Sequence, residues 1–253
     1  MEDPDAGYLD VKETFGIVSS DDREDYKSDT AYANYRELSG GKLKRGILHR
    51  SASPIDNIYG RVPYVVKLIE ADGVRFVLDL ADNADAIWDF ATDNAANGVD
   101  DSYFMGLYET GNVTCLGLST DYETEGYGET LAYGLSQLAE HDGPYLLHCM
   151  VGKDRTGFAC ALVEALAGAT YDEIEADYMI TYDNYYGITK TGTPAEYRAI
   201  RARNLDPILR FITGASADED LATIDYTQAA RTFLRDNGMD DAQIDKLVER
   251  ICG

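Results

Sequence analysis

The chain has 253 residues, of which 45% are apolar, so it is long enough to bury one sizeable hydrophobic core. Its formal net charge is −24, which argues against binding nucleic acid or an anionic membrane by general electrostatic attraction. The sequence also has no apolar span long enough to cross a bilayer. Strands and helices alternate without a long linker, which predicts one domain over 31–253 after an acidic N-terminal extension over 1–30.

Apolar periodicity predicts alternating elements. In chain order they are a strand over 44–50, a helix over 63–70, a strand over 75–81, a helix over 83–96, a strand over 113–118, a helix over 129–141, a strand over 144–147 and a helix over 156–168. Beyond residue 171 the chain reads as mainly helical, with stop signals at Gly187, Gly214 and Gly238. This order predicts an α/β fold with a central, mostly parallel sheet flanked by helices and a helical C-terminal region.

The segment His148–Gly157, with the sequence HCMVGKDRTG, lies between a predicted strand and a predicted helix. The unpaired amide N–H groups of a first helical turn favour an anion in such a loop, and the same field favours the thiolate form of Cys149. Thr156 is placed to donate a hydrogen bond to that thiolate. Arg155 offers a planar fork of donors that matches two phosphate oxygens. The loop therefore predicts a site where a cysteine attacks a phosphate ester.

This loop resembles the phosphate-binding loop of the cysteine-dependent protein tyrosine phosphatase superfamily, in the bacterial branch that has tyrosine and lipid phosphatase members. Arg50 and Ser51 are similar to the arginine–serine strand end of that branch. The resemblance implies a protein tyrosine phosphatase-like fold, Cys149 as the nucleophile of a phosphocysteine intermediate, Arg155 as the phosphate ligand, and no metal or other cofactor. The other loop residues expected to bind the phosphate are Met150, Val151, Gly152, Lys153 and Thr156.

The general acid is less clear from the sequence. Asp154 is the first candidate for the acid or for water activation, because the resembled branch is thought to use that aspartate. Asp79 and Asp82 are second candidates, since carboxyl ends of parallel strands gather at one edge of a sheet. Asp82 is read more simply as the cap of the next helix. The spacing around Trp88 predicts a residue packed on a helix face rather than part of a movable acid loop.

Two further loop residues have alternative readings. His148 precedes the cysteine on a strand, where neighbouring side chains point to opposite faces, so we expect a packed residue that fixes the loop rather than a base. Lys153 suits a substrate with a second phosphate or an acidic headgroup, but is equally well read as a solvated lysine. The histidines and cysteines have no zinc-ligand spacing.

The leading substrate is a phosphotyrosine protein, with dual specificity and phosphoinositide or inositol phosphate substrates close behind. The alternative from another class is a non-catalytic phosphate-binding module, against which the presence of both Cys149 and Arg155 argues. The sequence shows no secretory signal. The location stays open between the cytoplasm and an exported or cell-envelope protein whose signal is absent from this chain.

Overall fold

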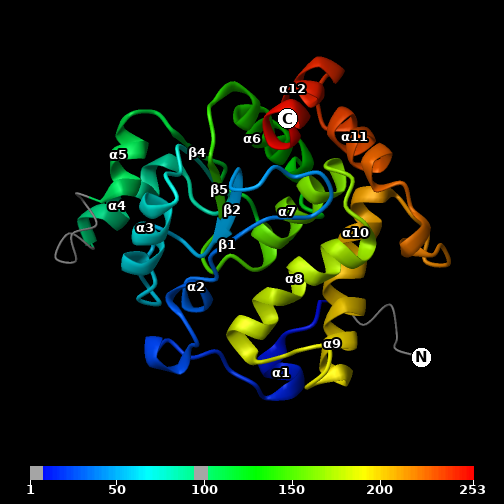
Figure 1. The fold of residues 1–253 in the computed structure, drawn as a ribbon, viewed down its shortest axis with the longest axis horizontal. Helices are drawn as coiled ribbons and strands as arrows, with labels where there is room; N and C mark the ends of the chain where they lie inside the picture. The colour runs from blue at the N-terminus through cyan, green and yellow to red at the C-terminus, as the bar shows by residue number, and fades with distance from the viewer. Residues whose placement is uncertain (1–7, 94–101) are drawn as a thin grey trace.

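The computed structural model describes residues 8–93 and 102–253 (Figure 1). Within these ranges one sheet has the strand order β1-β2-β5-β3-β4. Its strands are β1 (Arg36–Glu37), β2 (Leu48–Ser51), β3 (Phe76–Asp79), β4 (Val113–Cys115) and β5 (Tyr145–His148). The β1 strand pairs with β2 in the antiparallel direction, and all other pairs are parallel. The predicted α/β class with a mostly parallel sheet is therefore confirmed.

Side chains of successive strand residues point to opposite faces of this sheet. On β5, Tyr145 and Leu147 pack into the larger hydrophobic cluster, while Leu146 packs into a second cluster on the other face. The larger cluster is covered by α6 (Tyr127–Glu140), α7 (Asp154–Leu166), α8 (Tyr171–Tyr186), α10 (Asp206–Thr213), α11 (Tyr226–Asp236) and α12 (Asp241–Cys252). The second is covered by α3 (Val62–Ala71), α4 (Ala84–Asp93) and α5 (Tyr103–Glu109), on the left of the sheet in Figure 1.

Most predicted helices and strands are present, but they begin or end at residues shifted from the predicted ones. The helix ends predicted in the C-terminal region are also found. Gly187 and Gly214 cap α8 and α10 with positive φ angles of 65° and 69°, a conformation that glycine adopts without strain. The α11 helix ends at Asp236 with Asn237 as its cap, and Gly238 follows with a positive φ angle of 99°, so the helix stops where the sequence predicts. The part of the 83–96 helix prediction beyond Asp93 includes residues outside the described ranges.

The prediction for Trp88 is wrong, because this side chain is 51% exposed and contacts Tyr108 edge to face. The buried face of α4 consists of Ile87 and Ala91, which are four residues apart. Adjacent helical residues are separated by about 100° around the axis, so burying Ile87 turns Trp88 towards solvent.

The segment before residue 31 contributes to the same core. It contains α1 (Val11–Phe15), η1 (Arg23–Asp25) and the start of α2 (Asp29–Tyr32). Leu9 and Val11 are each 1% exposed and belong to the larger hydrophobic cluster. The division of the chain at residue 30 stays a prediction, although these contacts make one packed unit from residue 8 onward.

The remaining short elements are α9 (Pro194–Ile200), the π-helical stretch η3 (Arg201–Leu205) and η4 (Leu221–Thr223). Among the residues that the structure describes, no helix is both long enough and apolar enough to cross a membrane.

Candidate active site

The predicted phosphate loop lies at the carboxyl edge of the sheet. It connects the last residue of β5, His148, to the first residue of α7, Asp154. In the parallel pairing, Ser51 of β2 and Asp79 of β3 are both in register with His148. The ends of three parallel strands therefore meet beneath the loop, as expected when the carboxyl ends of parallel strands gather at one edge of a sheet.

Gly152 allows the loop to turn closely over the end of β2. Its φ angle is +66°, in the left-handed region. A Cβ atom built on Gly152 would lie 2.3 Å from the carbonyl oxygen of Ser51, which is backbone and cannot move aside. Both the positive φ and the close approach require glycine at this position.

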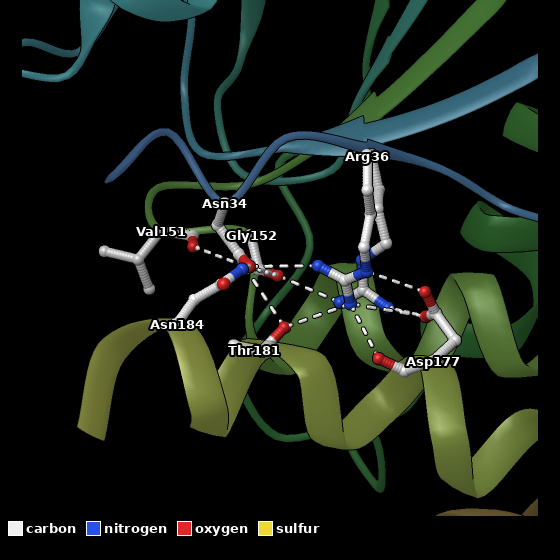
Figure 2. A network of polar contacts seen from close by, with 8 residues as sticks. Asn34, Arg36, Val151, Gly152, Asp177, Thr181 and Asn184 are labelled. Carbon is white, nitrogen blue, oxygen red and sulfur yellow. Dashed lines mark hydrogen bonds and ion pairs between the residues drawn. The ribbon is translucent and has the colours of Figure 1, made fainter. Parts of the chain in front are cut away.

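Side chains from distant segments bind the carbonyl oxygen of Gly152 (Figure 2). Arg50 Nη2 donates to it at 2.9 Å and Asn34 Nδ2 at 3.0 Å. Both side chains are buried. In a trans peptide the carbonyl oxygen and the following N–H point in opposite directions, so the N–H of Lys153 points away from Arg50 and Asn34.

The two preceding carbonyl groups of the loop are bound in the same manner. The hydroxyl of Tyr185 donates to Val151 O at 2.7 Å, and the backbone N–H of Ser53 donates to Met150 O at 3.1 Å. The N–H groups of Val151 and Gly152 therefore also point away from the bracing groups. Three consecutive amides, with the free N–H groups at the start of α7, can bind an anion on that side.

A buried ion cluster holds Arg50 in this position, and Figure 2 shows Asp177 of this cluster beside Arg36. Asp177 of α8 accepts from Arg50 Nη1 at 2.6 Å and from Arg36 Nε at 2.7 Å. Burial alone would raise the pKa of Asp177, but the two arginines outweigh burial and hold the pKa below its ordinary value. Burial and the Asp177 charge raise the pKa of the neighbouring Glu164 well above its usual range. Asp177 is therefore the charged partner of both arginines.

Cys149 and His148 lie on opposite sides of the sheet edge, as the strand geometry predicts. Cys149 is 3% exposed and belongs to the larger cluster, whereas the buried His148 ring lies edge to face with Phe104 of the second cluster. Burial lowers the pKa of His148 to about 4, so its ring is neutral near pH 7. This histidine packs beneath the loop.

Asp79 and Asp82 form a carboxyl pair beside the loop. Asp79 is fully buried, and its Oδ1 accepts from the backbone N–H groups of Ala81 at 2.9 Å and Asp82 at 3.0 Å. Burial raises the pKa of Asp79 to about 6, and burial together with the Asp79 charge raises that of Asp82 to about 7. The Oδ2 atoms of both side chains are buried without a hydrogen-bond partner among the described residues, so each carboxyl group is harder to ionise than it would be in water.

The interpretation of Asp82 as a helix cap is wrong. The side chain of Asn83 accepts the N–H of Ala86 at 3.0 Å and caps the first turn of α4. Asp82 lies one residue too early for that bond, and its Oδ2 is buried without a hydrogen-bond partner among the described residues.

The guanidinium of Arg155 lies between the carboxyl edge and a cavity. Its Nη1 donates to the carbonyl oxygens of Leu118 at 3.1 Å and Ala81 at 3.5 Å. The cavity has a volume of about 550 Å³ and is lined by Asp154 and Arg155, but not by Cys149. Its aromatic walls come from Tyr8, Tyr122, Tyr127, Phe158 and Tyr178.

Lys153 and Asp154 form a pair at the start of α7, with Lys153 Nζ 3.7 Å from Asp154 Oδ2. The Lys153 side chain is only 12% exposed, and its ammonium lies near the rings of Tyr8 and Tyr182. Burial alone would lower the pKa of Lys153, but Asp154 and the nearby tyrosines raise it overall. The reading of Lys153 as a solvated loop lysine is therefore wrong.

The hydroxyl of Thr156 is buried and has no hydrogen-bond partner among the described residues. The predicted bond to the Cys149 sulfur is therefore not formed in this structure. Across residues 8–93 and 102–253, no group of three or more His, Cys, Asp or Glu side chains is placed to hold a metal ion.

The sequence did not predict the side chains that stabilise the phosphate loop from a distance. These side chains lie on α8 and in the segment before β1. Asp177, Thr181 and Asn184 of α8 share one helix face and lie along the network in Figure 2. Their spacing of four and three residues, with polar side chains facing a buried side, was the available signal. Asn34, which adopts a positive φ of 49°, has no such local pattern.

We predict that Asp177→Asn lowers the free energy of unfolding by about 3–5 kcal/mol, because it leaves two buried guanidinium groups without a charged partner. Urea-induced unfolding measures this loss. The matched control is Asp183→Asn on the same helix, whose partner Lys27 has an 84% exposed side chain, so the cost should stay below about 1 kcal/mol. Equal costs for the two variants would refute the bracing role of Asp177.

Comparisons with known proteins agree with this geometry. Residues 31–253 match the family model described as the tyrosine phosphatase family. The triple specificity protein phosphatase PtpB of Mycobacterium tuberculosis is 28% identical over 116 residues, which are 41% of this chain and 42% of PtpB. A Cupriavidus necator protein, provisionally named a tyrosine-protein phosphatase, is 43% identical over 53 residues, which are 21% of this chain and 19% of that protein.

These alignments span less than half the length of either relative. The family model, in contrast, covers the sheet, the phosphate loop and every helix from α3 onward. The family inferred from the loop is confirmed, and the chain belongs to the tyrosine phosphatase family.

Proposed function

We propose that this protein is a cysteine-dependent phosphomonoester hydrolase, with phosphotyrosine protein as its leading substrate. The observation that carries the proposal is the bracing of three consecutive loop carbonyls, which leaves the N–H groups of Val151, Gly152 and Lys153 directed to the other side. Such preorganised donors suit the charge on a transferring phosphoryl group. The family match supports the same reaction class.

In the proposed reaction, the thiolate of Cys149 attacks phosphorus, the S–P bond forms, and the P–O bond to the leaving group breaks. A proton passes to the leaving oxygen, and water then cleaves the S–P bond to release phosphate. Arg155 binds two phosphate oxygens through the nitrogens that face away from Leu118 and Ala81. No metal or other cofactor takes part in this scheme.

The cavity beside Arg155 supports an aryl leaving group. Its volume of about 550 Å³ and its tyrosine and phenylalanine walls suit the ring of a phosphotyrosine and adjacent apolar side chains of a protein. The name of PtpB describes that relative as a phosphatase of triple specificity. We propose that this chain likewise acts on more than one class of substrate.

We predict that Cys149→Ser lowers kcat for p-nitrophenyl phosphate at least about 1,000-fold, because it removes the nucleophile. Phosphate release in the presence of EDTA provides the measurement. Cys252→Ser, which changes a half-buried thiol at the far end of α12, should retain the wild-type rate. Substantial turnover by Cys149→Ser would contradict the mechanism, and phosphate binding without turnover by the wild type would instead favour a non-catalytic binding module.

Asp154 is the proposed proton donor because it lines the cavity in which the leaving group would lie. We predict that Asp154→Asn lowers kcat for phenyl phosphate about 100-fold but lowers kcat for p-nitrophenyl phosphate less than about tenfold, because p-nitrophenolate leaves without protonation. Steady-state rates on the two esters measure this difference.

Asp82→Asn is the matched comparison, since Asp82 is a carboxyl group with a raised pKa that does not line the cavity. It should change both esters by the same factor. Asp82 would be the proton donor instead if Asp82→Asn lost mainly phenyl phosphate turnover while Asp154→Asn lost turnover of both esters equally.

A second candidate function is hydrolysis of phosphoinositides or inositol phosphates, favoured by the cation of Lys153 in the phosphate loop, two residues before the proposed phosphate ligand Arg155. We predict that Lys153→Ala lowers kcat/KM for a phosphoinositide more than for a phosphotyrosine peptide, because only the former carries further phosphates. Phosphate release from both substrates compares the two losses, and equal losses would reject the headgroup role.

A further inference from the structure

Tyr8 reaches the phosphate loop from outside the region that the family model matches, which begins at residue 31. Its hydroxyl donates to Asp154 Oδ1 at 2.5 Å. The Lys153 ammonium lies 5.6 Å from the centre of the Tyr8 ring. The ring also forms part of the cavity wall beside Arg155. Tyr8 therefore contacts both charged residues at the start of α7 and the space where we place the leaving group.

The backbone next to Tyr8 is clamped by a buried side chain. Leu9 N donates to Asn204 Oδ1 at 2.7 Å, and Asn204 Nδ2 donates to Leu9 O at 3.0 Å. Asn204 is 2% exposed and lies in the π-helical stretch η3. Its Nδ2 also donates to the hydroxyl of Tyr182 at 3.0 Å. Asn204 thus ties the N-terminal segment to α8.

The residues after Leu9 complete the anchor. The side chain of Asp10 accepts the N–H of Glu13 and caps α1, and Val11 is buried in the larger hydrophobic cluster. Leu9 is buried in that cluster as well. Because anchors on the C-terminal side fix the backbone, the Tyr8 side chain is presented at a defined place although the residue is 51% exposed.

The two oxygens of Asp154 have different partners. Tyr8 binds Oδ1, whereas Lys153 lies 3.7 Å from Oδ2. The hydrogen bond from Tyr8 fixes the plane of the Asp154 carboxyl group, whereas Lys153 lies at ion-pair distance and forms no hydrogen bond to it. Burial and the charges of Tyr182 and Asp154 raise the pKa of Tyr8, so its hydroxyl remains protonated and acts as the donor.

We propose that Tyr8 is a positioning residue of this phosphatase site: its hydroxyl donates to Oδ1 of the Asp154 carboxyl group and so leaves Oδ2 to carry the proton that passes to the leaving oxygen. This inference rests on the proposed function, in which Asp154 moves the proton. The segment before the family domain then completes the active site. Tyr8 acts through Asp154 and carries no charge or proton of the reaction itself.

The test is a double-mutant cycle of Tyr8→Phe and Asp154→Asn in the full chain, with p-nitrophenyl phosphate and phenyl phosphate as substrates. The assays use enough enzyme to measure the low turnover rate of the Asp154→Asn variant. We expect Tyr8→Phe to lower kcat for phenyl phosphate about 3–10-fold, which corresponds to the net loss of one ordinary hydrogen bond. KM and Tm should stay near the wild-type values. In the Asp154→Asn background, Tyr8→Phe should have no further effect on kcat.

The control is Tyr133→Phe, which removes a hydroxyl from a 57% exposed tyrosine of α6 and should leave kcat unchanged. The positioning role would be overturned if Tyr8→Phe kept the wild-type kcat. It would also be overturned if Tyr8→Phe lowered kcat by the same factor in the wild-type and Asp154→Asn backgrounds. An inactive Cys149→Ser together with a fully active Tyr8→Phe would refute only this inference. An active Cys149→Ser would refute the proposed function itself.

Discussion

A loop that binds phosphate through its backbone must turn its amide N–H groups inward, and the opposite carbonyl oxygens then need donors on the outer side. In this protein Arg50 and Asn34 supply those donors at Gly152, and Tyr185 supplies one at Val151. Unpaired buried carbonyls would cost free energy comparable to lost hydrogen bonds, so these donors stabilise the one conformation that can receive an anion. The rest of the site depends on this constraint.

The same contacts explain how a chain with a net charge of −24 can attract a phosphate. Arg36 and Arg50 share the one carboxylate of Asp177. Two buried guanidinium groups therefore lie behind the loop with a single directly paired carboxylate. Exposed carboxylates farther away are screened beyond about 8 Å at physiological ionic strength, whereas the buried charges are screened much less.

The residues that act next to each other in sequence were predictable, and those that act from a distance were not. The His148–Gly157 segment predicts its strand, turn and helix because glycine and helix-start signals are local. Asn34 and Tyr185 reach the loop only through tertiary packing, since they are 118 and 34 residues away in sequence from the carbonyl groups that they bind. The wrong predictions for Asp82 and Trp88 have a related cause. Neighbouring residues in the chain point in different directions, so an assignment that is off by one residue gives the wrong environment for the side chain.

The segment before residue 31 reaches the phosphate loop by two routes, which argues that it belongs to the working site. Tyr8 binds Asp154 directly, and Tyr26 packs edge to face on Tyr185, whose hydroxyl holds Val151. Arg61 lies over the ring of Tyr185 at 5.0 Å and donates to the hydroxyl of Tyr26. Burying leucine and valine side chains stabilises such a segment by about 1.5–3 kcal/mol each, which helps to offset the entropy of ordering it. An acidic composition alone would have suggested a solvated tail, but the anchored residues give this segment a fixed position from which a phenol can act on the loop.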